Sequence, residues 1–274
     1  MIKSIKIRGE FYFFRSAMND FLNTLMLILA FIPFSQKIMR IQSLIYQYLD
    51  SIQHLVFPNL CLQCQQEISR HEKYICAFCW MQLQRTYFEA YEEPSSMDKL
   101  FWGRCEIHRT FALYYFEKEQ PIQKILHALK YGHKEPLGNF LGAQIGNIIS
   151  SILKYQGIEA LIPVPIHPQK EFFRGYNQSE SLAIGLSTKL KIPVVTTLIV
   201  KKTNNASQTG KNRFLRWDNA SEQFSLTKQK LHYQHVAIVD DVITTGATLE
   251  SMVQLLRTKH PHLKISLISF AIVK

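Results

Sequence analysis

Residues 235–248 have the sequence HVAIVDDVITTGAT, and the fold expected for this chain follows from them. The apolar run at 236–239 is typical of a strand that is buried on both faces of a parallel sheet. Asp240 and Asp241 come at the expected carboxyl end of this strand, where open α/β sheets bind their ligands. Adjacent carboxylates there can accept hydrogen bonds from a ribose diol and can help to hold a hydrated Mg²⁺ ion.

The residues that follow the two carboxylates have the composition of a phosphate-binding loop. Glycine allows a tight turn, and threonine hydroxyls with the backbone N–H groups of a helix start suit a phosphate monoester. The residues expected at the phosphate are Thr244, Thr245, Gly246, Ala247 and Thr248. A Walker loop is excluded, because no Gly-Lys-Ser/Thr follows the strand. Carboxylates for a sugar and a helix N-terminus for its phosphate together predict a 5-phosphoribosyl site.

Strands and helices alternate along the second half of the chain. Besides the strand at 235–240, strands are expected at 110–116, 159–165, 193–200 and 264–272, and helices at 121–131, 136–155, 177–190 and 246–260. This alternation is typical of βαβ units, and so of an α/β fold with a mostly parallel sheet flanked by helices. The polar residues 201–223 are expected to form a long loop.

Four of the five cysteines form two CxxC pairs, namely Cys61 with Cys64 and Cys76 with Cys79. Each pair can place two thiolates on one metal ion, and two pairs complete a tetrahedral Zn²⁺ site. A module this short has little core, so the metal would provide most of its folding. Thiolate ligands in place of disulfides indicate a reducing compartment, and we therefore expect a cytoplasmic protein.

The N-terminal part of the chain leaves several alternatives open. Residues 21–34 are almost all apolar, but they are fewer than the about 20 residues that a membrane span needs. Three alternatives remain: residues 1–38 precede a true start at Met39, residues 21–34 are the apolar core of a signal peptide, or this segment is an anchor that contacts a membrane. The expected parts that follow are an amphipathic helix at 39–56, a zinc module at 57–85, a linker at 86–109 and an α/β domain at 110–274.

The net charge of +11 is placed unevenly along the chain. Residues 121–274 hold nineteen Lys and Arg against nine Asp and Glu, an excess of ten positive charges. A basic half favours ligands that carry phosphate, either nucleotides or nucleic acid. A solvated basic surface is the alternative interpretation.

The stretch VAIVDDVITTGATL at 236–249 resembles the phosphoribosyl-pyrophosphate-binding motif of the type I phosphoribosyltransferases. Pro163-Val164-Pro165 followed by FRGYNQS at 173–179 is similar to the PVP…RGFNQ signature of the ComF family of competence-associated and GntX-like proteins. The family spacing is also matched at Gln208, Arg216, Asn219 and Phe224, whereas Lys211 and Gln223 depart from it. The resemblance runs from about residue 57 to the C-terminus. It implies a type I phosphoribosyltransferase-like domain at 110–274 behind a small zinc-ribbon-like module with a structural zinc.

The resemblance implies an Mg²⁺-dependent phosphoribosyltransferase in which Asp240 and Asp241 act at the ribose. Ile166 and His167 are expected to form the loop that grips pyrophosphate, and Arg174 and Arg216 to pair with phosphate oxygens. The acceptor does not follow from these motifs. The ComF resemblance also implies a link to DNA uptake, with single-stranded DNA, a competence helicase or other DNA-processing proteins as partners. A second hypothesis is therefore a protein that uses the same fold to bind single-stranded DNA without catalysis.

Overall fold

The computed structural model describes residues 58–90, 94–202 and 223–274. The expected extension at 1–38, the expected helix at 39–56 and Arg216 lie outside the described residues. The chain divides into two units. The described residues 58–61 and 65–74 belong to the small unit, and residues 62–64 and the described residues from 75 onward belong to the large unit.

Backbone hydrogen bonds fold the chain back on itself around the first CxxC pair. Leu60 and Glu67 form an antiparallel bridge. The N–H of Ile68 donates to the carbonyl of Asn59 at 2.8 Å. The residues between Leu60 and Glu67 form a tight turn, and the first CxxC pair lies within it.

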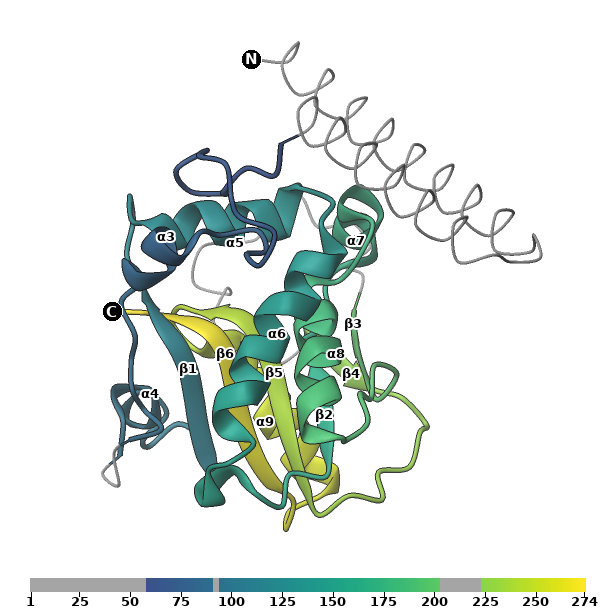
Figure 1. Cartoon of the computed structure of the whole chain (residues 1–274). Helices are drawn as coiled ribbons and strands as arrows, with labels where there is room; N and C mark the ends of the chain where they lie inside the picture. The colour runs from purple at the N-terminus through teal and green to yellow at the C-terminus, as the bar shows by residue number, and fades with distance from the viewer. Residues whose placement is uncertain (1–57, 91–93, 203–222) are drawn as a thin grey trace, which may run out of the picture. The chain divides into compact units, whose positions relative to one another are not determined.

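A parallel sheet of four strands forms the centre of the large unit, with the order β1-β6-β5-β2 (Figure 1). Its strands are β1 (Arg109–Phe116), β2 (Ala160–Pro163), β5 (His235–Ile243) and β6 (Lys264–Val273). Every neighbouring pair in this sheet runs parallel. The α/β class and the parallel sheet predicted from the sequence are confirmed.

Helices cover both faces of this sheet. In Figure 1, α6 and α8 lie side by side over one face, and α9 lies over the other. The helices that follow β1 are α5 (Pro121–Tyr131), α6 (Glu135–Ile149) and the 3-10 turn η1 (Leu153–Tyr155); those that follow β2 are α7 (Pro168–Arg174) and α8 (Gln178–Leu190); and α9 (Ala247–Lys259) joins β5 to β6. The short helix α7 was not expected, although Pro168 in its first turn and Gly175 after its last residue are common helix boundary residues.

The pattern of apolar residues explains why β5 is central. Residues 235–239 are buried without interruption, as expected for a strand that is covered on both faces. Val236 and Ile238 pack in one cluster with Leu249 and Met252 of α9. Burial of such side chains is the main source of stability in this layer arrangement.

Glycines bring α6 and α8 into close contact. A Cβ atom built on Gly142 would lie 1.9 Å from the Leu182 carbonyl oxygen, and one built on Gly185 would lie 2.0 Å from the Asn139 carbonyl oxygen. The two helix backbones therefore approach closely where neither residue has a side chain. This contact fixes the start of α8, which contributes Ser179 to the site described below.

Residues 86–109, expected to be a linker, add a helix and three core side chains to the large unit. Phe88, Met97 and Phe101 are buried in the same cluster as α9. The helix α4 (Ser96–Leu100) begins with a capping box, in which Ser95 and Asp98 satisfy each other's backbone N–H groups. Many residues of this segment are acidic or polar, so its composition predicted a linker although it contains these few buried apolar side chains. The helix α3 (Ala77–Met81) lies earlier in the chain; Cys76 caps its start, and Cys79 lies within it.

The expected strand at 193–200 is divided in the structure. Val194 forms a single parallel bridge with Leu161 of β2. Further along, β3 (Ile199–Lys201) pairs antiparallel with β4 (Phe224–Leu226). The expected helix at 136–155 ends at Ile149.

Candidate functional site

The centre of the candidate site is the carboxyl-terminal part of β5. Asp240 is half-buried, and its Oδ1 accepts hydrogen bonds from the Ser179 hydroxyl and from the Asp241 N–H, both at 2.9 Å. Ser179 lies in the first turn of α8. Two elements that are distant in sequence therefore fix one carboxylate. Ser179 ends the FRGYNQS stretch at 173–179, but its sequence pattern indicated no role for its hydroxyl.

Asp241 has a different environment. Its side chain is 5% exposed, and its Oδ2 lies 2.7 Å from the Lys130 ammonium in the last turn of α5. Lys130 was also missed by sequence reasoning, since no local pattern relates it to a residue more than a hundred positions further along.

Burial and the negative charge of Asp241 raise the pKa of the Asp240 carboxyl above its ordinary value. The Asp241 backbone N–H, the Ser179 hydroxyl and the Lys130 ammonium act in the opposite direction. A cation or a sugar hydroxyl placed beside Asp240 would stabilise its ionised form. The pair has the hard oxygen atoms that suit Mg²⁺, and Asp240 is the less buried of the two residues.

The expected phosphate loop follows β5 directly and leads into α9. Thr244 and Thr245 are exposed, and Thr248 is half-buried. Gly246 adopts φ 74°, a left-handed conformation that favours glycine, and a Cβ atom there would lie 2.8 Å from the Phe101 ring. The helix starts at Ala247, so its first N–H groups face the loop as the sequence predicted.

Arg104 supports this loop from the segment that had been expected to be a linker. Its Nη1 donates to the Thr245 carbonyl at 2.8 Å, and its Nε donates to Glu250 in the first turn of α9 at 3.0 Å. The guanidinium thereby ties the turn of the loop to the helix that the loop opens. The sequence holds no local sign of this role, because the partners are about 140 residues away.

The second expected loop lies on the neighbouring strand. Because β2 pairs with β5 in parallel, and Pro163 stands opposite Val239, the residues after β2 begin beside Asp240. Ile166 and His167 are half-buried in this loop. The structure therefore brings both expected phosphate-binding loops to the same edge of the sheet.

His167 and Arg174 make contacts that hold the structure after β2. The His167 Nδ1 accepts a hydrogen bond from the Gln169 N–H at 3.2 Å and so caps α7. Arg174 donates to the Gln178 side chain at 2.8 Å, and its guanidinium lies 5.4 Å from the centre of the Tyr131 ring.

A further cation near the carboxylates is Lys201 of β3. Its ammonium lies 5.4 Å from the centre of the Phe224 ring. Burial and the charge of Lys170 lower the pKa of Lys201, and Asp240 opposes this shift. Lys201 is therefore within electrostatic range of Asp240.

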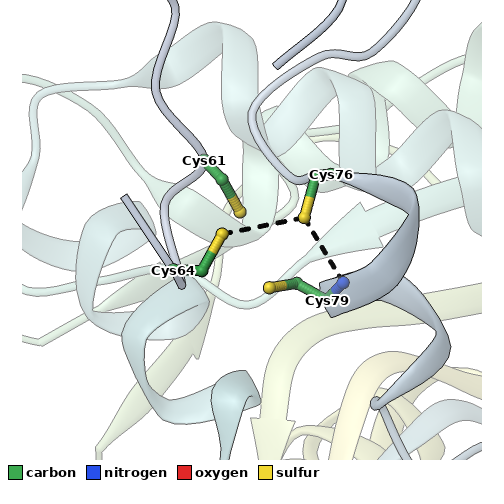
Figure 2. A group of neighbouring side chains, drawn as sticks. All are labelled: Cys61, Cys64, Cys76 and Cys79. Carbon is green, nitrogen blue, oxygen red and sulfur yellow. Dashed lines mark hydrogen bonds between the residues drawn. The ribbon is translucent and has the colours of Figure 1, made fainter. Parts of the chain in front are cut away.

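The four paired cysteines form a separate candidate metal centre. Figure 2 shows Cys61, Cys64, Cys76 and Cys79 with their sulfur atoms facing one another, and these atoms all lie within 4.8 Å of one another. The sulfurs of Cys64 and Cys76 are 3.8 Å apart. Tetrahedral zinc with bonds of about 2.3 Å spaces its sulfur ligands by about 3.8 Å, so the cluster could bind a metal ion such as zinc. The N–H of Cys79 also donates to the Cys76 sulfur at 3.4 Å.

Within the described ranges, no helix is both long enough and apolar enough to cross a membrane.

Comparison of the chain with known proteins identifies its fold. Residues 177–273 match the phosphoribosyl transferase domain, and the predicted type I phosphoribosyltransferase fold is confirmed. A solved structure with a similar fold is a hypoxanthine phosphoribosyltransferase from Staphylococcus aureus, with 14% identity, a TM-score of 0.28, and coverage of 51% of this chain and 62% of that one. The fold assignment rests on the domain match and on the strand order described above.

Relatives of known name cover most of the chain. It is 29% identical over 215 residues to Competence protein F of Haemophilus influenzae, with 74% of this chain and 86% of the relative covered. It is 25% identical over 214 residues to the DNA utilization protein YhgH of Escherichia coli K12, with 74% and 92% covered. These relatives confirm the resemblance to the ComF family that the sequence motifs indicated.

Proposed function

We propose that this protein binds 5-phosphoribosyl pyrophosphate together with Mg²⁺ and transfers the phosphoribosyl group to an acceptor. One observation carries the proposal: the Asp240-Asp241 pair, the loop at 244–248 and the loop at 164–167 meet at one edge of the sheet. Carboxylates for a ribose, a helix start for its 5-phosphate and a second loop for pyrophosphate are the parts that such a ligand needs.

The chemistry proposed is displacement at C1′ of the ribose. The bond from C1′ to pyrophosphate breaks, and the acceptor forms the new bond as positive charge develops on the sugar. Bound Mg²⁺ would neutralise charge on the departing pyrophosphate. Asp240 would accept hydrogen bonds from the ribose, and the residues at 244–248 would hold the 5-phosphate in place.

Isothermal titration of phosphoribosyl pyrophosphate, with and without Mg²⁺, tests the proposal. We expect binding that depends on Mg²⁺ and that the Asp240→Asn/Asp241→Asn double variant loses. A wild-type protein that shows no binding under either condition would refute the ligand assignment. Release of pyrophosphate with a candidate acceptor would then test the transfer step.

A second candidate function is binding of single-stranded DNA, in the service of DNA uptake or processing. It is favoured by the excess of ten positive charges on residues 121–274 and by relatives named for competence and DNA utilization. Fluorescence anisotropy with a labelled single strand should show affinity that falls steeply with salt. Binding that the Asp241→Asn variant retains would separate this function from the nucleotide-sugar site.

We also propose that the cysteine cluster holds one structural Zn²⁺ ion, which fits a protein of the reducing cytoplasm.

A further inference from the structure

Lys130 lies in the last turn of α5, and the packing of this helix fixes its position. The helix buries Ile122, Ile125 and Leu129, and this face sets the direction in which the last turn projects. The Lys130 side chain is 23% exposed, and its ammonium lies 2.7 Å from Oδ2 of Asp241. A cation is also favoured there because the carbonyl end of a helix carries partial negative charge.

The two adjacent carboxylates differ in what they can reach. Asp241 is 5% exposed, and within the described part of the chain no hydrogen bond of regular geometry reaches its Oδ2. The ion pair with Lys130 is the contact that this oxygen makes. Asp240 is more exposed and is held by Ser179 instead. Asp240 is therefore the carboxylate that a ligand can approach, whereas Asp241 already has a partner.

Further contacts hold the end of α5 beside the segment that follows the pyrophosphate loop. The Tyr176 hydroxyl donates to the Leu129 carbonyl, and the Arg174 guanidinium lies over the Tyr131 ring. Lys130 stands between these two contacts in the sequence. The last turn of α5 is thus held by β5 through Lys130, and by the chain after the loop at 164–167 through Leu129 and Tyr131.

We propose that Lys130 binds the pyrophosphate of the ligand and that Asp241 is a positioning residue that holds Lys130 in place. An ammonium group has three donors, and one of them points to Asp241, so two can reach phosphate oxygens. Asp240 then acts at the ribose and Asp241 acts through the lysine. This inference rests on the proposed function. It assigns different roles to Asp240 and Asp241, which the sequence pattern alone does not distinguish.

The test compares the affinities of the full chain for pyrophosphate and for ribose 5-phosphate, each titrated calorimetrically with Mg²⁺. The variants are Lys130→Met, Asp241→Asn and the two combined. Lys259→Met is the matched control, because Lys259 is an exposed lysine in the last turn of α9. Thermal melting of each variant identifies any that fails to fold, and Lys130→Arg, which keeps the charge, covers that case.

We expect Lys130→Met and Asp241→Asn each to weaken pyrophosphate binding about tenfold or more, as loss of a hydrogen bond between charged groups does. The combined variant should lose no more than either alone, since both changes remove one interaction. Lys130→Arg should recover part of the affinity. Ribose 5-phosphate binding and the Lys259→Met protein should be unchanged.

Each of the following results would overturn the proposal. If wild-type protein binds pyrophosphate and Lys130→Met binds it equally well, or if the losses of the two single variants add, Lys130 and Asp241 do not act together and only this inference fails. An equal loss of ribose 5-phosphate affinity would overturn the assignment to pyrophosphate. Wild-type protein that binds neither pyrophosphate nor phosphoribosyl pyrophosphate would remove the proposed function and this inference with it.

Discussion

At the scale of single residues, Asp240 lowers the stability of the fold because its surroundings disfavour its charge. Its carboxylate is held next to a second carboxylate, and burial and this neighbour both raise its pKa. Groups kept in such surroundings cost stability and are common at functional sites. The same contacts leave Asp240 ready for a ligand that supplies positive charge or hydrogen-bond donors.

Asp240→Asn should therefore make the protein more stable while it weakens ligand binding. The amide removes the repulsion from Asp241 and keeps an oxygen that can accept from Ser179. We expect the melting temperature to rise by about 2–4 °C, the shift that about 1 kcal/mol gives a chain of this size. Calorimetric melting measures it, with Glu117→Gln at a surface ion pair as the control. A fall in melting temperature would contradict the expected repulsion.

The buried side chain of His235 should make the stability of the protein depend on pH. It is 5% exposed, and its Nε2 lies 2.9 Å from the Ser266 hydroxyl. Burial, with a smaller effect of His108, lowers the pKa of His235 to about 4. The unfolded chain takes up this proton near pH 6.5 and the folded chain near pH 4, so the free energy of unfolding should fall as pH drops through this window.

Urea unfolding between pH 7 and pH 4.5 measures this effect. Other groups also titrate, so the informative quantity is the difference from His235→Gln, which has no proton to gain. We expect wild-type protein to lose stability more steeply than the variant as the solution is acidified. Parallel curves for the two proteins would show that His235 takes up its proton equally in both states.

At the scale of elements, the sequence predicted most of the strands and helices because each has a clear apolar period. The buried run of β5 and the periodic faces of α5 and α9 depend on local pattern, and local pattern is what sequence reasoning detects. The contacts that complete the site are of another kind. Arg104 and Lys130 reach partners more than a hundred residues away, and no spacing rule predicts such pairs. The segment 86–109 was expected to be a linker for the same reason, since its few anchors are buried only by distant elements.

The proposed phosphate loop at 244–248 is the element in which backbone geometry matters most. Gly246→Ala would place a Cβ atom in a left-handed conformation and 2.8 Å from the Phe101 ring. We expect a loss of about 1–3 kcal/mol in unfolding free energy, together with weaker binding of ribose 5-phosphate. Urea unfolding and calorimetric titration measure the two effects.

Gly103→Ala is the matched control for this change. Gly103 has a φ of 72°, almost the same as Gly246, but a Cβ atom there would meet nothing within 4 Å. It therefore reports the cost of the backbone conformation alone. If Gly246→Ala costs no more than Gly103→Ala, the contact with Phe101 does not constrain the loop.

For the whole molecule, two kinds of candidate site lie on one chain: a cluster of four thiols early in it and the proposed ribose-phosphate site late in it. The CxxC spacing alone predicted the thiol cluster, because the ligands of a metal knuckle are close in sequence. The proposed ribose-phosphate site depends on strand order, so the sequence indicated candidate carboxylates and loops but not the side chains that contact them.

Metal content is the test of the first of these sites. Purified protein should contain about one zinc ion per chain, and Cys64→Ser or Cys76→Ser should lose it and lower the melting temperature, because three thiolates hold zinc less tightly than four. Cys105→Ser is the matched control: burial, with a smaller contribution from Glu250, raises the pKa of Cys105 to about 11, so this thiol stays protonated. Elemental analysis of the variants measures the ion directly. Zinc lost from the Cys105 variant, or kept by both of the others, would show that the four paired cysteines are not its ligands.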